Sequence, residues 1–455
     1  MSGTPPQLTR DSFRLLPPPP FNPTIRISQS MIWYQDWLYV GGGRGPLKTE
    51  SRGKQAPADD NALGAEICRY SPTENRWERV YSSPVVGDGE PVARDRSVRA
   101  HAITTDKQGV ETLYFGIGSL QDQVIIVATE DGSTFRECGE AGLNQPDSDI
   151  ASIRRLCVVG NKVFTSPVGK NKGRGMADDN VADVVAVFES DTSLTKPWKM
   201  VSEPNFGDEH NESINDLIEF NGQLYAATLN RRGGFQVWKS SSKRTSQARW
   251  KKVIDNGAYR YAANPVPTCM QVFNGALYIG TGVQRQGKWG NDKYGPIAPE
   301  LIRVNDDDSW DLICGESRCT PDGLKTPLSG KGAGFDHLFT QAFWTMTEHH
   351  GLLYIGTSDW RFWPSYLPRG ARHQREDLSQ QRVQYLRQET KKFSGHYALY
   401  CSADGVNWDT VTQTGLGNNP DNYAIRGLLS TPAGLMVVPA SSGKTSAGIE
   451  LWCAD

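Results

Sequence analysis

Acidic residues gather in two segments of the chain where they could bind a divalent cation. The first reads DDNVAD (178–183), and the second reads DEHNESIND (208–216). Several carboxylates within one loop suit a hard cation such as Mg²⁺, which usually also binds substrate phosphates. Short acidic strings are also common as solvated loop charge, and that interpretation stays open. We expect a Mg²⁺ site formed by Asp178, Asp179, Asp183, Glu209, Glu212, Asn215 and Asp216.

Basic residues lie near the starts of several expected strands and on a neighbouring loop. Guanidinium groups that converge from separate segments can hold a carboxylate or a phosphate through paired hydrogen bonds. A structural bond to loop carbonyls is the alternative for any single arginine. The residues expected to bind an anionic substrate are Arg99, Arg154, Arg155, Arg426 and Lys170.

Aromatic residues are dense in the same regions, above all in SDWRFWPSY (358–366). Such rings can wall a pocket, and their faces stabilise a positive charge by roughly 0.5–2 kcal/mol each. Flat sugars stack on the same faces. The side chains expected to contact substrate are Trp289, Trp344, Trp360, Trp363 and Tyr261.

A repeat sets the positions of all these residues. Seven times a turn leads into a short apolar pair, most clearly in FNGQLYAAT (220–228), FNGALYIGT (273–281) and HHGLLYIGT (349–357). One unit, 213–253, contains four strand-like runs: SINDLIEF, GQLYAATL, FQVWKSS and RWKKVI. Alternating apolar and polar residues between Gly and Asn are typical of strands. Repetition of this kind predicts repeated antiparallel sheets.

The sequence therefore predicts an all-β fold, a seven-bladed β-propeller with four-stranded antiparallel blades in a single domain, 1–455. The last unit contains only three strands, so we expect Phe13-Arg14-Leu15-Leu16 to supply its fourth strand and close the ring. The expected blade cores are 28–82, 97–138, 151–203, 213–256, 267–315, 341–414, and 424–455 with 11–16.

Long insertions between second and third strands point to function on one face, since long ordered loops in compact folds usually act. They are 43–66, 165–184, 281–299 and 358–396. The last holds a helical insertion near 375–393, with a thin apolar stripe at Leu378, Val383, Leu386 and Phe393. It is expected either to cover the mouth as a lid or to form a solvated surface helix.

Two turns, SADGVNW (402–408) and TEDGSTF (129–135), resemble the Asp-box of sialidase-type (BNR-like) propellers. The usual box has one residue between Asp and Gly, and none is present here. The resemblance implies a folding device on the face away from the active site. Asp131, Asp404 and the run 306–308 are accordingly assigned to structure.

The string DDNVAD also resembles the aspartate-rich motif of class I terpene cyclases, although the following NDLIEF (215–220) lacks the Ser and Glu of their second motif. That resemblance implies a Mg²⁺-dependent lyase or cyclase that ionises an isoprenoid diphosphate, with Asp178, Asp179 and Arg155 catalytic. Its substrate would be small, hydrophobic and anionic. A glycan-directed hydrolase or lyase of sialidase-like type and a non-catalytic binding propeller are the alternatives.

Composition narrows the class of protein further. A net charge of −2 argues against non-specific nucleic-acid binding. No apolar stretch approaches the ~18 residues of a membrane span, and the first residues lack the apolar core of a secretory signal. The eight cysteines are expected as buried thiols, and a cytoplasmic location is expected. Five histidines could instead surround the axis, as in the iron site of carotenoid oxygenases: His101, His210, His337, His373 and His396.

Overall fold

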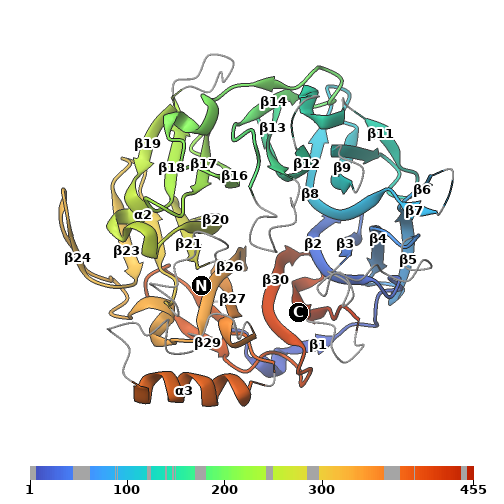
Figure 1. Ribbon diagram of the computed structural model, residues 1–455. Helices are drawn as coiled ribbons and strands as arrows, with labels where there is room; N and C mark the ends of the chain where they lie inside the picture. The colour runs from blue at the N-terminus through green and yellow to red at the C-terminus, as the bar shows by residue number, and fades with distance from the viewer. Residues whose placement is uncertain are drawn as a thin grey trace, which may run out of the picture.

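The computed structural model describes residues 7–44, 62–87, 89, 91–119, 124–138, 141–145, 148, 150–169, 181–241, 250–283, 297–362, 380–393, 395–441 and 448–455. Within them the strands form sheets arranged around a central axis, a β-propeller (Figure 1). The predicted all-β fold is confirmed.

Each blade is a run of antiparallel strands that pair in chain order, and the pairing is consistent with the predicted seven blades. The first three blades are β2 (Ile25–Tyr34), β3 (Trp37–Arg44), β4 (Glu66–Ser71) and β5 (Arg76–Ser82); β8 (Asp95–Thr105), β9 (Glu111–Ser119), β10 (Val124–Thr129) and β11 (Arg136–Cys138); and β12 (Ile150–Val159), β13 (Lys162–Gly169), β14 (Phe188–Asp191) and β15 (Lys199–Met200). The next two are β16 (Ser213–Phe220), β17 (Gln223–Leu229), β18 (Gln236–Ser240) and β19 (Trp250–Ile254); and β20 (Val266–Phe273), β21 (Ala276–Gly282), β22 (Leu301–Val304) and β23 (Trp310–Cys314). The last two are β26 (Thr340–His349), β27 (Leu352–Asp359), β28 (Leu399–Ser402) and β29 (Asp409–Thr412); and β30 (Asn422–Thr431), β31 (Gly434–Ser441), β32 (Trp452–Ala454) and β1 (Phe13–Leu15).

Smaller elements join or flank the blades. Two short hairpins are β6 (Val85–Val86) with β7 (Val92–Ala93), and β24 (Arg318–Thr320) with β25 (Gly323–Lys325). The helical elements are η1 (Arg10–Ser12), η3 (Ala141–Asn144), η4 (Pro204–Gly207), α2 (Asn256–Tyr259), η6 (Tyr261–Ala263), η7 (Ala333–Asp336), η8 (Trp360–Phe362) and α3 (Gln380–Lys391). In the part of the chain that the structure describes, no helix is long and apolar enough to cross a membrane.

The ring closes by pairing the two ends of the chain, as predicted. Strand β1 lies antiparallel to β32, with Phe13 opposite Ala454 and Arg14 opposite Cys453. The Phe13 side chain is buried among residues of the last two blades. Through this closure β1 supplies the fourth strand of the seventh blade, so that only this short strand forms the blade's outer edge.

Apolar side chains fill the spaces between neighbouring blades. One cluster joins Tyr34 and Tyr39 of the first blade to Phe115 of the second. Another joins Phe220 and Tyr225 of the fourth blade to residues of the fifth. All eight cysteines are free thiols, and five of them are buried, in agreement with the expected absence of a disulfide framework: Cys68, Cys269, Cys314, Cys401 and Cys453.

The two Asp-box turns have the same hydrogen bonds, which confirms their structural assignment. Asp131 Oδ1 accepts from the amides of Ser133 (2.8 Å) and Thr134 (2.7 Å). Asp404 Oδ1 accepts from the amides of Val406 (2.8 Å) and Asn407 (2.7 Å). In the third acidic turn, which belongs to the fifth blade, Asp308 forms ion pairs with Lys239 and Lys251 of the fourth blade.

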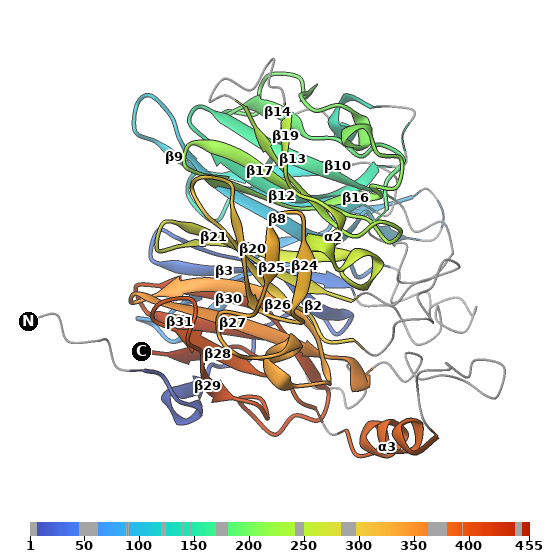
Figure 2. The same ribbon diagram turned by 90° about the vertical axis from the view of Figure 1, so that its left-hand side faces the viewer.

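The insertion helix α3 forms within the predicted segment but does not cover the mouth. It lies at the outer edge of the disc in both views (Figures 1 and 2). Its Leu386 is fully buried against Phe339 and Trp360. The lid interpretation is therefore wrong, because one apolar residue of the helix docks on the flank of the sixth blade. The side chains of Leu378 and Val383 lie outside the described residues.

Candidate functional site: an arginine cluster on the propeller axis

The innermost strand of every blade faces the axis, and the seven innermost strands lie side by side around it (Figure 1). In a regular strand, successive side chains point to opposite faces of the sheet. In a propeller these faces pack against the neighbouring blades. A side chain can turn toward the axis only where this alternation is broken.

All seven innermost strands break it at the same place. Each contains a β-bulge, in which its register against the second strand shifts by an extra residue. In β8, for example, Val98 pairs with Ile117 of β9 and Ala100 pairs with the next residue along β9, Gly116. Arg99, between Val98 and Ala100, is therefore an extra residue with no partner position on β9. In β12, Arg154 and Arg155 together occupy the shifted interval between Ile153 and Leu156. A bulge re-aims the extra side chain.

These extra residues define what we call the axial ring. Six of them are partly exposed and Asn215 is 8% exposed, whereas the residue before each one is buried. This difference in exposure is expected if the extra side chain points away from the blade interface and toward the axis. The axial ring consists of Gln29, Arg99, Arg154, Asn215, Thr268, Trp344 and Arg426.

Two arginines of the axial ring, Arg99 and Arg426, act electrostatically on the third, Arg154. Burial lowers the pKa of Arg154 well below its ordinary value, and the charges of Arg99 and Arg426 lower it further. Burial also lowers the pKa of Arg426. A bound anion would favour the charged form of Arg154, and the convergence of Arg99, Arg154 and Arg426 on one anion stays a prediction.

The fourth predicted arginine has a carboxylate partner. Arg155 Nε and Nη2 donate to the two oxygens of Asp216, at 2.6 and 3.2 Å. The same carboxylate accepts from the amides of Leu217 (3.0 Å) and Met270 (2.8 Å). Arg155 lies deep within the protein, yet 46% of its side-chain surface is accessible. Solvent therefore reaches the Arg155 side chain. Asp216 is 2% exposed and serves to position Arg155.

An aromatic group borders the axial ring on the side of the last two blades. The guanidinium of Arg426 lies 4.6 Å from the centroid of the Trp344 ring, a cation–π contact. Tyr423 stacks on Phe362 with centroids 4.0 Å apart and 8° between planes, and it lies 6.4 Å from Trp344. The sequence analysis assigned Trp344 to substrate contact and did not assign Tyr423 or Phe362, which pack beside it. A ligand held by the arginines would therefore meet aromatic surface on one side.

The remaining residues of the axial ring are neutral and polar. Asn215 Oδ1 accepts from Arg154 Nη2 at 3.4 Å, and its amide donates to the carbonyl of Pro267 at 3.1 Å. The hydroxyl of Thr268 donates to the carbonyl of Phe343. Gln29 Oε1 is buried, and no donor among the described residues reaches it. A buried acceptor without a donor is unfavourable by about 1–3 kcal/mol.

A neutral histidine lies beside these groups. His101, in β8, shares a 2.8 Å hydrogen bond between its Nδ1 and Ser30 Oγ of β2. Burial, helped by the charge of Arg155, lowers the pKa of His101 to about 3. The imidazole therefore remains uncharged near neutral pH and adds no charge to the axial ring.

The two acidic segments meet beside the axial ring, as far as the described residues extend. The amide of Ala182 donates to the carbonyl of Glu212 at 3.4 Å. The Glu212 carboxylate, however, accepts from Arg231. Glu209 is 89% exposed and lies 3.9 Å from His210 Nε2. Asp183 is exposed, and Asp178 and Asp179 lie outside the described residues.

A Mg²⁺ site is not formed by the described residues alone. Among them, no group of three or more His, Cys, Asp or Glu could hold a metal ion. Asp216 is committed to Arg155 and two amides, and so it does not fit as a metal ligand. The proposed metal site now depends on Asp178 and Asp179 and stays a prediction. The iron-site alternative also includes His373, outside the described residues.

The aromatic predictions had mixed outcomes. Trp360 is 1% exposed, its Nε1 donates to the carbonyl of Leu338 at 2.7 Å, and its ring packs on Phe339. It supports α3 and walls no pocket, so this assignment was wrong. Tyr261 is 56% exposed in η6, outside the innermost strands that form the axial ring. Lys170, Trp289 and Trp363 lie outside the described residues.

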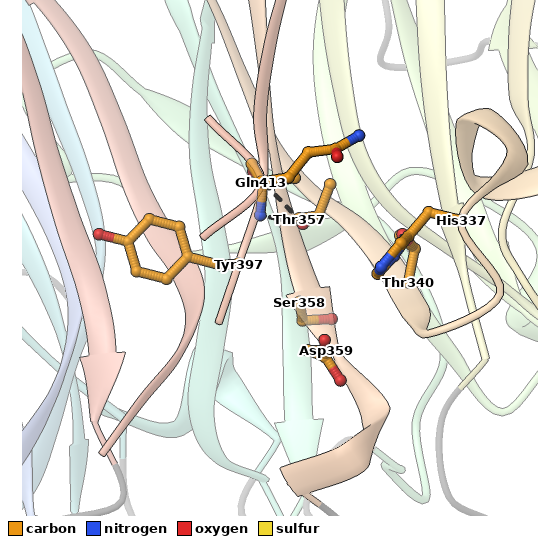
Figure 3. A pocket seen from close by; sticks show the side chains of 8 residues that line it. His337, Thr340, Thr357, Ser358, Asp359, Tyr397 and Gln413 are labelled. Carbon is orange, nitrogen blue, oxygen red and sulfur yellow. Dashed lines mark hydrogen bonds between the residues drawn. The ribbon is translucent and has the colours of Figure 1, made fainter. Parts of the chain in front are cut away.

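A small pocket in the sixth blade is a separate feature (Figure 3). It is lined in part by His337, Thr340 and Asp359. His337 Nδ1 is bonded to Thr340 Oγ1 at 3.0 Å, and Asp359 forms an ion pair of 2.6 Å with Arg361. Since these polar groups bond to one another, the pocket is a less suitable ligand site than the axial ring.

Fold and site together define this protein as a β-propeller with a cationic axis. No family model matches the chain, and no curated protein matches it. Among solved structures, the β-propeller domain of the Trilobed protease from Pyrococcus furiosus is 8% identical, covering 94% of each chain, with a TM-score of 0.44. The GH74 xyloglucanase from Xanthomonas campestris is 12% identical, covering 97% of this chain and 56% of its own, with a TM-score of 0.47. The Trypanosoma rangeli sialidase in complex with sialic acid is 10% identical, covering 74% of this chain and 52% of its own, with a TM-score of 0.40. The chain thus spans about half the length of the last two, and each likeness concerns the fold alone.

Proposed function

We propose that this protein binds a small hydroxylated organic anion, of the acidic-sugar class, on the propeller axis. The observation that carries the proposal is the equivalent position of Arg99, Arg154 and Arg426 at the bulges of three innermost strands, together with the effect of Arg99 and Arg426 on Arg154. Three blades each have an arginine at a bulge, from which a side chain can turn toward the axis. Guanidinium groups bind carboxylates through paired, charge-assisted hydrogen bonds.

The neutral members of the axial ring favour a hydroxylated ligand. Gln29 Oε1 needs a donor, and a sugar hydroxyl is one. Trp344, beside Tyr423, offers an aromatic face on which a sugar ring can stack. Because Asp216 is held by Arg155, the described residues provide for binding rather than for proton transfer. Hydrolysis or elimination on a glycan remains a proposal that needs further groups.

The second candidate is the Mg²⁺-dependent lyase or cyclase acting on a prenyl diphosphate. One observation favours it: the amide of Ala182 bonds to the carbonyl of Glu212, next to the Arg154–Asn215 contact. The end of the DDNVAD segment therefore lies near the arginines. However, Trp344 is the one aromatic residue of the axial ring, whereas a carbocation needs several ring faces around it.

Titration calorimetry at low salt separates the two candidates. Glucuronate is compared with glucose, which has the same ring without the carboxylate, and pyrophosphate is titrated with and without Mg²⁺. We expect glucuronate to bind and glucose not to bind. Arg154→Gln should weaken glucuronate binding roughly tenfold, since a hydrogen bond to a charged group contributes about 1.5–3 kcal/mol.

The matched control is Arg136→Gln, which removes a charge from an exposed arginine on β11. This control should bind like the unmodified protein. Failure of glucuronate to bind would refute the acidic-sugar proposal. Mg²⁺-dependent binding of pyrophosphate that is lost in Asp178→Ala/Asp179→Ala would establish the second candidate in its place.

A further inference from the structure

Two more arginines occupy bulges on the innermost strands, closer to the strand starts. In β2, Ile25 and Ile27 face the adjacent residues Arg44 and Gly43, so Arg26 is extra. In β8, Asp95 and Ser97 face Ser119 and Gly118, so Arg96 is extra. Because β2 and β8 are neighbouring innermost strands, these two arginines, which we call the upper pair, belong to adjacent blades (Figure 1).

The upper pair is set apart from the other strand arginines by its surroundings. Both side chains are partly buried. Arg79, Arg94, Arg155 and Arg303 each form an ion pair with a carboxylate. Within the residues that the structure describes, neither Arg26 nor Arg96 has an ion pair or a side-chain hydrogen bond. The nearest carboxylate in sequence, Asp95, is bound to Arg94 and Tyr81 instead.

The distance between the upper pair and the axial ring follows from strand geometry. Arg26 precedes Gln29 by three residues, and Arg96 precedes Arg99 by three. At about 3.3 Å per residue, three residues advance the backbone by roughly 10 Å. The upper pair therefore lies toward the face that carries the long insertions, since Arg44, opposite Ile25, ends β3 where the 43–66 insertion begins.

We propose that Arg26 and Arg96 form a second anion subsite, so that the ligand is an acidic oligosaccharide carrying at least two carboxylates. One carboxylate binds Arg99, Arg154 and Arg426, and another binds the upper pair. Sugar rings span the distance between the two carboxylates, beside Gln29. This inference rests on the proposed function, because it takes the axial ring as the first subsite.

The test compares the binding of an acidic monosaccharide, which has one carboxylate, with the binding of its trisaccharide, which has three. Galacturonate and trigalacturonate are titrated by calorimetry into the full chain, into Arg26→Gln/Arg96→Gln, and into Arg14→Gln/Arg136→Gln, two exposed arginines, as the charge-matched control. We expect trigalacturonate to bind the unmodified protein at least tenfold more tightly than galacturonate does. The double variant should lose at least tenfold for trigalacturonate and stay within about twofold for galacturonate.

A second measurement needs no substitution. Binding of trigalacturonate to the unmodified protein should weaken more steeply with salt than binding of galacturonate, because it involves more charge pairs. Equal salt dependence, or a double variant that binds trigalacturonate like the unmodified protein, would overturn the second subsite while leaving the first intact. If neither compound binds the unmodified protein, the proposed function fails, and the second subsite fails with it.

Discussion

At the scale of single residues, the axial ring combines positively charged arginines with the neutral imidazole of His101 beside them. Burial disfavours the charged form of Arg154, and the charges of Arg99 and Arg426 disfavour it further. Asp216 forms its ion pair with Arg155, and its charge offsets part of the shift of Arg154. Concentrated like charge lowers the stability of the unliganded protein, and a bound anion removes that cost.

His101 makes a specific contribution to the pH dependence of stability. Its folded-state pKa of about 3 lies below the ordinary value of about 6.5. Between these values the unfolded chain binds a proton that the folded protein does not. The free energy of unfolding should therefore fall as the pH drops from 6.5 towards 3, by up to about 1.4 kcal/mol per pH unit from this residue.

The measurement is urea unfolding of the unmodified protein and of His101→Gln between pH 7 and pH 4. The difference in unfolding free energy between the two should shift in favour of the variant as the pH falls. Arg155 and Ser30 face the imidazole and are unchanged in the comparison. His350→Gln, at an exposed histidine, is the control. Parallel pH profiles for His101→Gln and the unmodified protein would contradict the neutral assignment.

Residue types and positions predicted which arginines could form a cluster, but not the direction in which their side chains point. Arg99, Arg154 and Arg426 could be chosen because each falls near the start of an expected innermost strand. The bulges were not predicted, because the one-residue shift that each causes in the alternating pattern can equally mark the end of a strand or a buried polar residue. Trp360 shows the opposite failure: a dense aromatic string does not tell whether a ring lines a cavity or supports a helix. Its partner Phe339 lies 21 positions away in sequence, and that contact is tertiary.

At the scale of elements, the turn between third and fourth strands links neighbouring blades. In the second blade, the carbonyl of Gly132 accepts from the Tyr39 hydroxyl of the first blade at 2.9 Å. In the sixth, Gly405 lies against Tyr278 of the fifth. Both tyrosines are the second residue of the repeated apolar pair. The repeated pair of one blade therefore contacts the Asp-box turn of another blade. The sequence showed each half but not their pairing.

Two glycines of the sixth blade separate backbone conformation from this contact. Gly405 and Gly351 both have φ of +75°. A Cβ at Gly405 would lie 1.9 Å from the Tyr278 hydroxyl oxygen, whereas nothing lies within 4 Å of a Cβ at Gly351. Gly351→Ala should cost about 1–2 kcal/mol, the left-handed strain alone. Gly405→Ala should cost more, by roughly 1–3 kcal/mol, because the turn or the tyrosine must move.

Urea unfolding of the two alanine variants measures this difference directly. In a Tyr278→Ala background, the ring that a Cβ at Gly405 would meet is absent, and Gly405→Ala should cost about as much as Gly351→Ala. Equal costs for Gly351→Ala and Gly405→Ala would show that the tyrosine contact does not constrain the turn.

At the scale of the whole molecule, the ring is held closed by three residue pairs between β1 and β32. Every other blade is continuous in sequence. The composition of the last unit made this closure predictable, because three strands were present where four were needed. If the seam between the chain ends is where the ring first opens, a covalent bond across it should slow or prevent unfolding.

Arg14→Cys provides that bond, because Arg14 lies directly opposite the free thiol of Cys453. Opposed residues in antiparallel strands have Cα atoms about 4.5–5.5 Å apart, within the range that a disulfide spans. The lost Arg14–Asp455 ion pair, 3.8 Å long between exposed side chains, contributes little. For a loop of nearly the whole chain the chain-entropy model gives about 6 kcal/mol, and engineered disulfides deliver less, so the oxidised variant should gain at least about 3 kcal/mol over its reduced form. Urea unfolding of the oxidised and reduced forms of the same variant, with the bond verified by mass spectrometry, measures the gain. A verified bond that leaves the unfolding midpoint unchanged would place the first opening of the ring at another blade interface.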